Sequence, residues 1–99
     1  MEIHNGQITF GPLSGTGPRS SSNTVTFSAN PTQAVAIMTG FSASFSGGND
    51  HHLGNLDVRL RNSIAGNTVT VTATFGLRDW SGNWDDNYEG IVFFSVVGE

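Results

Sequence analysis

Residues 67–77 read Asn67-Thr68-Val69-Thr70-Val71-Thr72-Ala73-Thr74-Phe75-Gly76-Leu77, and this stretch decides the fold. Apolar side chains occupy every second position, and threonines fill most of the positions between them. Successive side chains of a β-strand point to opposite faces. The pattern therefore predicts a strand with one buried and one polar face, as in an antiparallel sheet with one side in solvent.

The same alternation occurs elsewhere in the chain. Leu56, Val58 and Leu60 alternate with Asp57, Arg59 and Arg61. In the stretch 35–45, we expect one set of side chains to point one way: Val35, Ile37, Thr39, Phe41, Ala43 and Phe45. Helical periodicity is nearly absent. We predict strands near residues 2–10, 23–29, 34–46, 55–62, 67–78 and 88–97.

Turn residues separate these strands, for example at Asn30-Pro31, Gly47-Gly48-Asn49 and Ala65-Gly66-Asn67. Residues 12–22 form a Gly/Ser/Pro stretch that predicts a flexible loop. The spacing of short strands predicts an all-β, six-stranded antiparallel β-sandwich. The 99 residues are expected to form one domain, residues 1–99, with a modest core.

Charge is scarce. Charged residues make up 12% of the chain, against about 25% in a typical globular domain, and the net charge is −4. All four basic residues are arginine. An acidic chain of this kind is not expected to bind nucleic acid or anionic membranes. Apolar runs are too short for membrane insertion.

The sequence leaves the compartment open. It contains no cysteine, so neither a disulfide framework nor thiol chemistry is expected. The N-terminal residues Met1-Glu2-Ile3-His4 lack the basic and apolar regions of a signal peptide. Both a cytoplasmic location and secretion by a non-classical route are compatible with these features.

The expected last strand is apolar on both faces, from Ile91 to Val97. One face can cover the sandwich core. A neighbouring subunit would cover the other; alternatively, this is a central strand whose second face lies under loops. Asp57, Arg59 and Arg61 share one strand face, which favours a subunit contact through charged pairs over a simply solvated surface.

The segment from Arg78 to Gly90 concentrates the candidate functional residues. Its thirteen positions hold both tryptophans, the only tyrosine and four of the eight acidic residues. Sugars are bound by a flat apolar ring surface together with carboxylate, amide and hydroxyl groups. This loop supplies that combination; the alternative is that one tryptophan plugs an end of the core.

Other chemistry is less well supported. The carboxylates Asp79, Asp85, Asp86 and Glu89 suit calcium, but their spacing matches no EF-hand. Asp50-His51-His52 lacks partners for a closed zinc site, so we expect no metal and no cofactor. There is no G-x-S-x-G motif. A carboxylate pair for glycoside cleavage is available, but so small a sandwich has little room for a deep cleft, and no catalytic residue is expected.

In order and spacing, the chain resembles the H-type lectins, the family of snail agglutinins and discoidins. The resemblance covers most of the chain. It rests on Asn5-Gly6-Gln7-Ile8, Asn23-Thr24-Val25-Thr26-Phe27-Ser28, the Asn30-Pro31 turn before the strand Ala34 to Phe41, Asn55-Leu56-Asp57-Val58, and the closing Val96-Val97-Gly98-Glu99.

The resemblance implies a six-stranded antiparallel β-sandwich that forms homotrimers, or hexamers of paired trimers. It also implies a shallow site for galactose or N-acetylgalactosamine at subunit junctions, and a role in cell adhesion. By position, Trp80 resembles the stacking Trp, Tyr88 the Tyr after it, and Asn55 the Asn that opens the middle strand.

The chain departs from the family pattern at several positions. The family's sugar-binding Arg falls on Asp57 here, with Arg59 as a substitute, and its His falls on Ser81. The loop after Trp80 is longer and adds Trp84, Asp85 and Asp86.

The expected function is that of a non-enzymatic, oligomeric lectin whose partners are glycans or glycoconjugates. The expected ligand-binding residues are Trp80, Tyr88, Asn55, Asp79, Trp84, Asp85, Asp86 and Arg59. Two alternatives stay open: a structural assembly module that oligomerises through the sandwich, and a calcium-dependent binding module.

Overall fold

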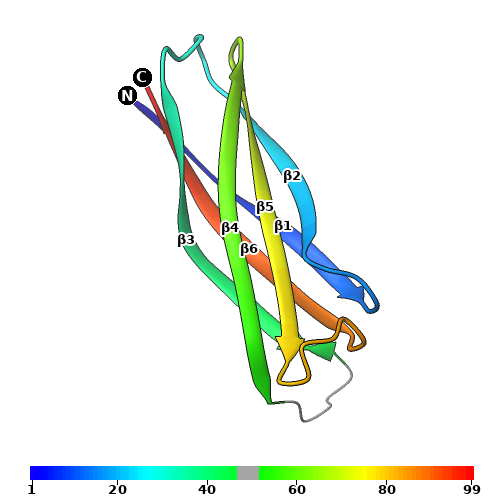
Figure 1. Cartoon of the computed structure of the whole chain (residues 1–99). Helices are drawn as coiled ribbons and strands as arrows, with labels where there is room; N and C mark the ends of the chain where they lie inside the picture. The colour runs from blue at the N-terminus through cyan, green and yellow to red at the C-terminus, as the bar shows by residue number, and fades with distance from the viewer. Residues whose placement is uncertain (47–51) are drawn as a thin grey trace.

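The computed structural model describes residues 1–46 and 52–99 and is built almost entirely of β-strands (Figure 1). No α-helix occurs in the described residues. The six strands are β1 (Glu2–Leu13), β2 (Arg19–Thr26), β3 (Ala34–Phe45), β4 (Leu53–Ala65), β5 (Thr68–Asp79) and β6 (Tyr88–Gly98). The predicted all-β class is confirmed. The turn predicted at residues 47–49 lies outside the described residues.

The strands form two three-stranded antiparallel sheets, with the orders β1-β6-β3 and β2-β5-β4. Only β4 and β5 are neighbours both in sequence and in a sheet. The other connections cross between the sheets, which makes a sandwich elongated along its strands, with both termini at one end (Figure 1). The segment between β5 and β6 lies at the opposite end.

The core lies between the two central strands. The alternation that predicted β5 is confirmed, because its apolar side chains are all buried: Val69, Val71, Ala73, Phe75 and Leu77. Val92, Phe94 and Val96 of β6 face them from the other sheet and are also buried. Removal of this apolar surface from water is the main favourable contribution to folding.

The prediction for β3 is wrong in one respect. Its outward and inward positions exchange at a register shift between Met38 and Gly40, where the pairing with β6 skips a residue. Val35 and Ile37 are about half exposed, at 52% and 49%, whereas Ala43 and Phe45 pack against the core. A β-bulge inserts one residue, so period two cannot continue through it. Simple alternation therefore placed Val35 and Ile37 on the wrong face.

The predicted loop at 12–22 is also too long. β1 continues to Leu13 and β2 begins at Arg19, so only residues 14–18 connect them. The strand extends because its serines have partners: the hydroxyl groups of Ser22 and Thr72 lie 2.7 Å apart across β2 and β5. Polar residues that suggest a loop in sequence can therefore form the solvent-facing side of a strand.

Asparagine side chains join the open edges of the two sheets. The Asn62 side chain accepts a hydrogen bond from the Ala36 amide and donates one to the Ala34 carbonyl, each 3.1 Å long. On the other edge, the Asn23 amide donates to the Gln7 carbonyl over 3.0 Å. These bonds link β4 to β3 and β2 to β1, so they hold the two sheets in fixed alignment.

The β4–β5 hairpin confirms the turn predicted at 65–67. Ala65 pairs with Thr68, which leaves Gly66 and Asn67 as a two-residue turn. Gly66 has a φ of 63°, in the region that a side chain disfavours and that tight hairpins require. This turn sets the register of β4 against β5, and that register positions the residues described below.

No helix in the described part of the chain is long and apolar enough to span a membrane.

Candidate functional site

The candidate site lies where β5 ends, β4 begins and the segment 80–87 crosses to β6. The Trp80 amide donates a 3.0 Å hydrogen bond to the His52 carbonyl and ties the segment to the start of β4. A Cβ on Gly54 would come within 2.1 Å of the Asp79 carbonyl oxygen. Gly54 therefore permits a close backbone approach that a larger residue would prevent.

Trp80 presents its indole to solvent. It is 75% exposed, more than any other large apolar residue described here except Met1. Its backbone is anchored to His52, whereas its ring has no ring-stacking or cation–π contact among the described residues. An exposed ring on an anchored backbone offers an apolar platform at a defined place.

Trp84 has a different environment from Trp80. Its ring packs against the edge of the core and lies 5.9 Å from the Tyr88 ring, centroid to centroid. The Arg78 guanidinium lies over the indole at 4.7 Å, within cation–π range. The ring fills the space left by Gly17 and Gly76, where an added Cβ would approach it to 2.3 and 2.7 Å. Trp84 thus closes this end of the sandwich.

Tyr88 is fully buried. Its hydroxyl donates to the Thr16 carbonyl over 3.2 Å, and its ring lies under the Arg19 guanidinium at 4.4 Å. Arg19 also donates 2.8 Å hydrogen bonds to the carbonyls of Gly11 and Tyr88. In this single chain, Tyr88 is positioned to hold the 14–18 connection against the core rather than to touch a ligand.

Three carboxylates converge at the same end of the sandwich as Trp80. One oxygen from each of Asp79, Asp85 and Asp86 lies within 4.8 Å of the others. Asp79 is oriented by Ser81, whose backbone amide and hydroxyl both donate to the same carboxylate oxygen, over 2.9 and 2.5 Å. These oxygens suit sugar hydroxyls, which donate hydrogen bonds, and they also suit a hard cation such as calcium.

Asn55 and Arg59 lie along β4, on the face that points away from the core. Asn55 pairs with Arg78 of β5 and is exposed near the Trp80 end. Arg59 is two outward positions farther along and donates 2.9 and 2.7 Å hydrogen bonds to Asp57. These hydrogen bonds hold the pKa of the Asp57 carboxyl below its usual value and raise the pKa of Arg59. Asp57 and Arg59 thus pair with each other within this chain, and the subunit contact through this strand face stays a prediction.

The structure therefore divides the eight predicted ligand-binding residues into groups. Trp80, Asp79, Asp85, Asp86 and Asn55 gather at one end of the sandwich. Trp84 and Tyr88 form the packed base of that end, and Arg59 lies on the adjoining strand face. The packing of the Trp84 ring against Gly17 and Gly76 was not predicted from sequence. Nothing in the sequence around either glycine shows that a tryptophan ring lies against it. Residues Asp50 and His51 lie outside the described part of the chain.

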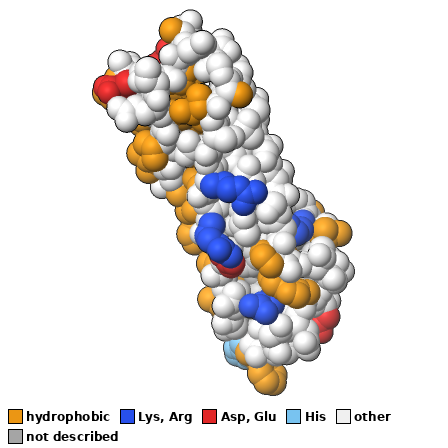
Figure 2. Space-filling view, turned by 45° about the horizontal axis from the view of Figure 1, so that its top comes forward, with side chains coloured by type: hydrophobic (Ala, Val, Ile, Leu, Met, Phe, Trp, Pro, Cys, Tyr) orange, Lys and Arg blue, Asp and Glu red, His pale blue; other side chains and the backbone are white. Residues whose placement is uncertain are grey.

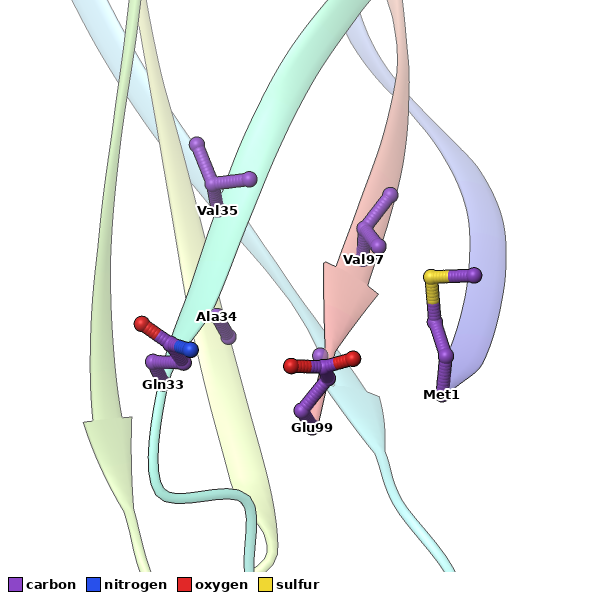
Figure 3. Close-up of a pocket in the computed structure, with 7 residues that line it drawn as sticks. Met1, Gln33, Ala34, Val35, Val97 and Glu99 are labelled. Atoms are coloured by element: carbon purple, nitrogen blue, oxygen red, sulfur yellow. The ribbon is translucent and has the colours of Figure 1, made fainter.

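A second feature is the outer face of the sheet β1-β6-β3. Its large exposed apolar side chains include Ile3, Val35, Ile37 and Phe93, between 36% and 57% exposed. Ile3, Val97 and Val35 lie in one row across the three strands. At the terminal end, this face leads into an open hollow of about 230 Å³ where Met1, Val35 and Val97 lie together (Figure 3).

Comparisons with protein-family models, with curated proteins and with solved structures find no match for this chain. What the candidate site can bind is therefore inferred from the chemistry of its own side chains. These side chains offer an exposed aromatic ring, a group of carboxylates and an amide on one end of a rigid β-sandwich.

Proposed function

We propose that this protein is a non-enzymatic carbohydrate-binding module of lectin type, with Trp80 as the platform on which a sugar ring stacks. The observation that carries the proposal is the exposed Trp80 indole, directly after Asp79 in the chain, together with the convergence of the Asp79, Asp85 and Asp86 carboxylates. The apolar face of a sugar, such as that of galactose or N-acetylgalactosamine, would contact the ring, and its hydroxyls would donate to the carboxylates. The resemblance to H-type lectins supports this proposal.

The roles of the two tryptophans follow from their surroundings. Trp80 contacts the ligand, while Trp84 and Tyr88 keep the segment 80–87 in place beneath it. Asn55, at the exposed start of β4, supplies an amide that both donates and accepts hydrogen bonds. The site is open, so single-site affinity is weak, and several copies in one oligomer raise the avidity for a multivalent glycan.

The oligomer in this proposal forms through the apolar outer face of β1-β6-β3. The outward positions of that face carry Asn, Gln, Thr and Ser between the apolar residues, and among the described strand residues only Glu89, at one end, is charged. A second copy would therefore meet the face without repulsion between like charges. Trimers or hexamers are the states that the family resemblance implies.

A glycan array on labelled protein, with Trp80→Ala beside the wild type, tests the proposal. Wild-type protein is expected to bind a defined terminal sugar, and the variant to lose that binding while it keeps its fold and oligomeric state. Ile64→Ala is the matched control, because Ile64 is also exposed, at 39%, but lies at the far end of β4. A blank array from folded, oligomeric wild-type protein would overturn the proposal.

A second candidate function is an assembly module without a glycan ligand, which the exposed apolar face of β1-β6-β3 favours. In that case Trp80 would be buried at a contact between proteins, because Trp is a frequent hot-spot residue at interfaces. The Trp84→Phe variant leaves Trp80 as the only tryptophan. Blue-shifted emission from the oligomer of this variant supports the assembly module, whereas red-shifted emission that responds to sugar supports the lectin.

A calcium-dependent form of binding is favoured by one observation, the convergence of three carboxylate oxygens within 4.8 Å. Calcium takes 6–8 oxygen ligands, so a bound sugar or water would supply those that the three carboxylates do not. Repeating the array in a strong chelator decides between the two forms. Binding that survives chelation removes calcium from the proposed site.

A further inference from the structure

The arginines of this chain all lie on one sheet. Arg19 is on β2, Arg59 and Arg61 are on β4, and Arg78 is on β5, so the sheet β2-β5-β4 carries every basic charge of a protein whose net charge is −4. Figure 2 shows arginine side chains spaced along this surface, with a single acidic side chain against them in the middle. Arg59, Arg61 and Arg78 take outward positions of this sheet, whereas Arg19 turns inward over the Phe10 and Tyr88 rings. Three of the four arginines therefore lie on the hydroxyl-rich outer face.

Two of these arginines share a hollow with two hydroxyl groups. Arg59 pairs with Thr74 and Arg61 with Thr72 in the register of β4 and β5. Directly opposite residues are about 5 Å apart, and outward neighbours on one strand are about 7 Å apart. An open hollow of about 190 Å³ is lined by Arg59, Leu60, Arg61, Thr72 and Thr74. It is too small for a whole drug-sized ligand and suits a single charged group.

The hydroxyl groups of the hollow are held by the neighbouring strand. The Ser22 and Thr72 hydroxyls lie 2.7 Å apart, and those of Ser20 and Thr74 lie 3.4 Å apart. A hydroxyl donates one hydrogen and accepts others, so each pair can turn a hydrogen toward the hollow. The site thus offers two guanidinium groups and two anchored hydroxyls on a rigid sheet.

Of the two positive charges in the hollow, only that of Arg59 is paired with a carboxylate, Asp57. Asp57 accepts from the Nε and one terminal nitrogen of Arg59, and the other terminal nitrogen points to no described acceptor. Arg61 forms no ion pair or hydrogen bond with any residue that the structure describes. Two guanidinium groups on outward neighbours of one strand, about 7 Å apart, repel each other. An anion between the two arginines would relieve that repulsion and accept charge-assisted hydrogen bonds from both.

We propose that Arg59, Arg61, Thr72 and Thr74 bind the sulfate or carboxylate group of an acidic glycan. The inference rests on the proposed function in taking the ligand to be a glycan. It adds a specificity-determining subsite to the platform at Trp80. The outward side of β4 joins the two, because Asn55 lies near Trp80 and Arg61 follows six residues later, about 20 Å along the strand. The ligand is therefore an extended oligosaccharide whose acidic group lies several sugar units from the ring that stacks on Trp80.

The test compares sulfated and desulfated forms of one galactan oligosaccharide by titration calorimetry at fixed ionic strength. The wild type is expected to bind the sulfated form about tenfold more tightly, because charge-assisted hydrogen bonds are the strong ones. Arg61→Gln is expected to abolish that preference and to leave binding of the desulfated form unchanged, with a melting temperature no lower than that of the wild type. Ser63→Gln, the same side chain at the next outward position of β4, is the matched control.

Each outcome bears on one of the two proposals. Equal binding of both oligosaccharides by wild type, with no effect of Arg61→Gln, overturns the acidic subsite and leaves the lectin proposal standing. Binding of neither oligosaccharide nor of any array sugar overturns both. An oligonucleotide of equal charge that binds as tightly, and is lost equally in Arg61→Gln, overturns the glycan as the ligand of this face. Inorganic sulfate that displaces only the sulfated oligosaccharide supports the subsite.

Discussion

The indole of Trp84 lies against Gly76, and a Cβ on Gly76 would come within 2.7 Å of the ring. Gly76 occupies an outward position of β5, in line with Thr72 and Thr74. The preceding outward positions of this strand all carry threonine, so Gly76 is the one without a side chain. The missing side chain makes room for the ring, which in turn lies under Arg78 and beside Tyr88. The absence of a side chain at Gly76 is therefore one condition for the position of Trp84 and of the segment 80–87 that carries it.

Replacing this glycine should displace the ring. Gly76→Ala is expected to lower the free energy of unfolding by about 1–3 kcal/mol, the usual cost of overpacking, and to red-shift the Trp84 emission. Chemical denaturation and fluorescence measure the two effects. Gly11→Ala is the control, because nothing lies within 4 Å of a Cβ added there. Equal stability of the two variants would contradict the packing described for Trp84.

The two tryptophans should respond differently to truncation. Trp80→Ala is expected to abolish glycan binding and to change the free energy of unfolding by no more than about 0.5 kcal/mol, as for most exposed positions. Trp84→Ala should cost about 2 kcal/mol, less than a fully buried Trp, because its ring is only partly buried. Thermal unfolding and array binding of both variants measure these effects. Retention of binding in folded Trp80→Ala would exclude Trp80 as the platform.

The apolar outer face should control assembly. Ile37→Lys places a charge on the apolar outer face of β1-β6-β3, at a position of the edge strand β3 that is 49% exposed, and is expected to dissociate the oligomer into folded monomers. Thr70→Lys adds the same charge to the opposite sheet and should leave the oligomer intact. Sedimentation velocity reports the masses. A wild type that is monomeric at all concentrations would rule out assembly through this face.

Acid should weaken the fold through Glu2. Its carboxylate accepts hydrogen bonds from Ser28 and contacts His4, and these contacts, led by the Ser28 hydroxyl, lower its pKa from 4.5 to about 2. A carboxyl with a lower pKa in the folded state than in the unfolded state stabilises the protein above its unfolded pKa. This contribution is complete above about pH 4.5 and disappears as the pH falls to about 2.

Denaturation midpoints of wild type and Glu2→Gln measure this contribution. The two proteins should differ at about pH 6 and converge at about pH 2. Glu99→Gln removes the same charge at the chain end and is the control for the change in net charge. A constant difference between wild type and Glu2→Gln over the whole range would show that the Glu2 carboxylate does not contribute through its ionisation.

The carboxylate cluster should respond to charge removal. If calcium binds there, Asp86→Asn lowers calcium affinity and removes the calcium-induced rise in melting temperature, because a ligand that binds only the folded state stabilises it. If the carboxylates serve sugar directly, melting temperature is insensitive to calcium and to a chelator in both proteins. Differential scanning fluorimetry with and without calcium distinguishes these results.

Several features were predictable because they depend on neighbours in sequence. The buried set from Val69 to Leu77 and the turn at Gly66 follow from side-chain alternation and from the backbone freedom of glycine. The clustering of Trp80, Asp79, Asp85 and Asp86 was also visible, because these residues lie on one short segment. By contrast, the sequence did not show that the inward and outward positions of β3 exchange after Met38. That exchange comes from a bulge, and a bulge depends on how β3 pairs with β6.

The sequence by itself determined that the chain is all-β, which residues of β5 form the core, and which loop holds the aromatic and acidic groups. These depend on local periodicity and on composition. Only the tertiary structure decided that Trp84 closes the sandwich while Trp80 stays exposed, because that difference requires Gly17, from a distant part of the chain, and Gly76 to meet the Trp84 ring. It also placed Arg59 and Arg61 opposite Thr74 and Thr72, because strand register is a property of paired strands.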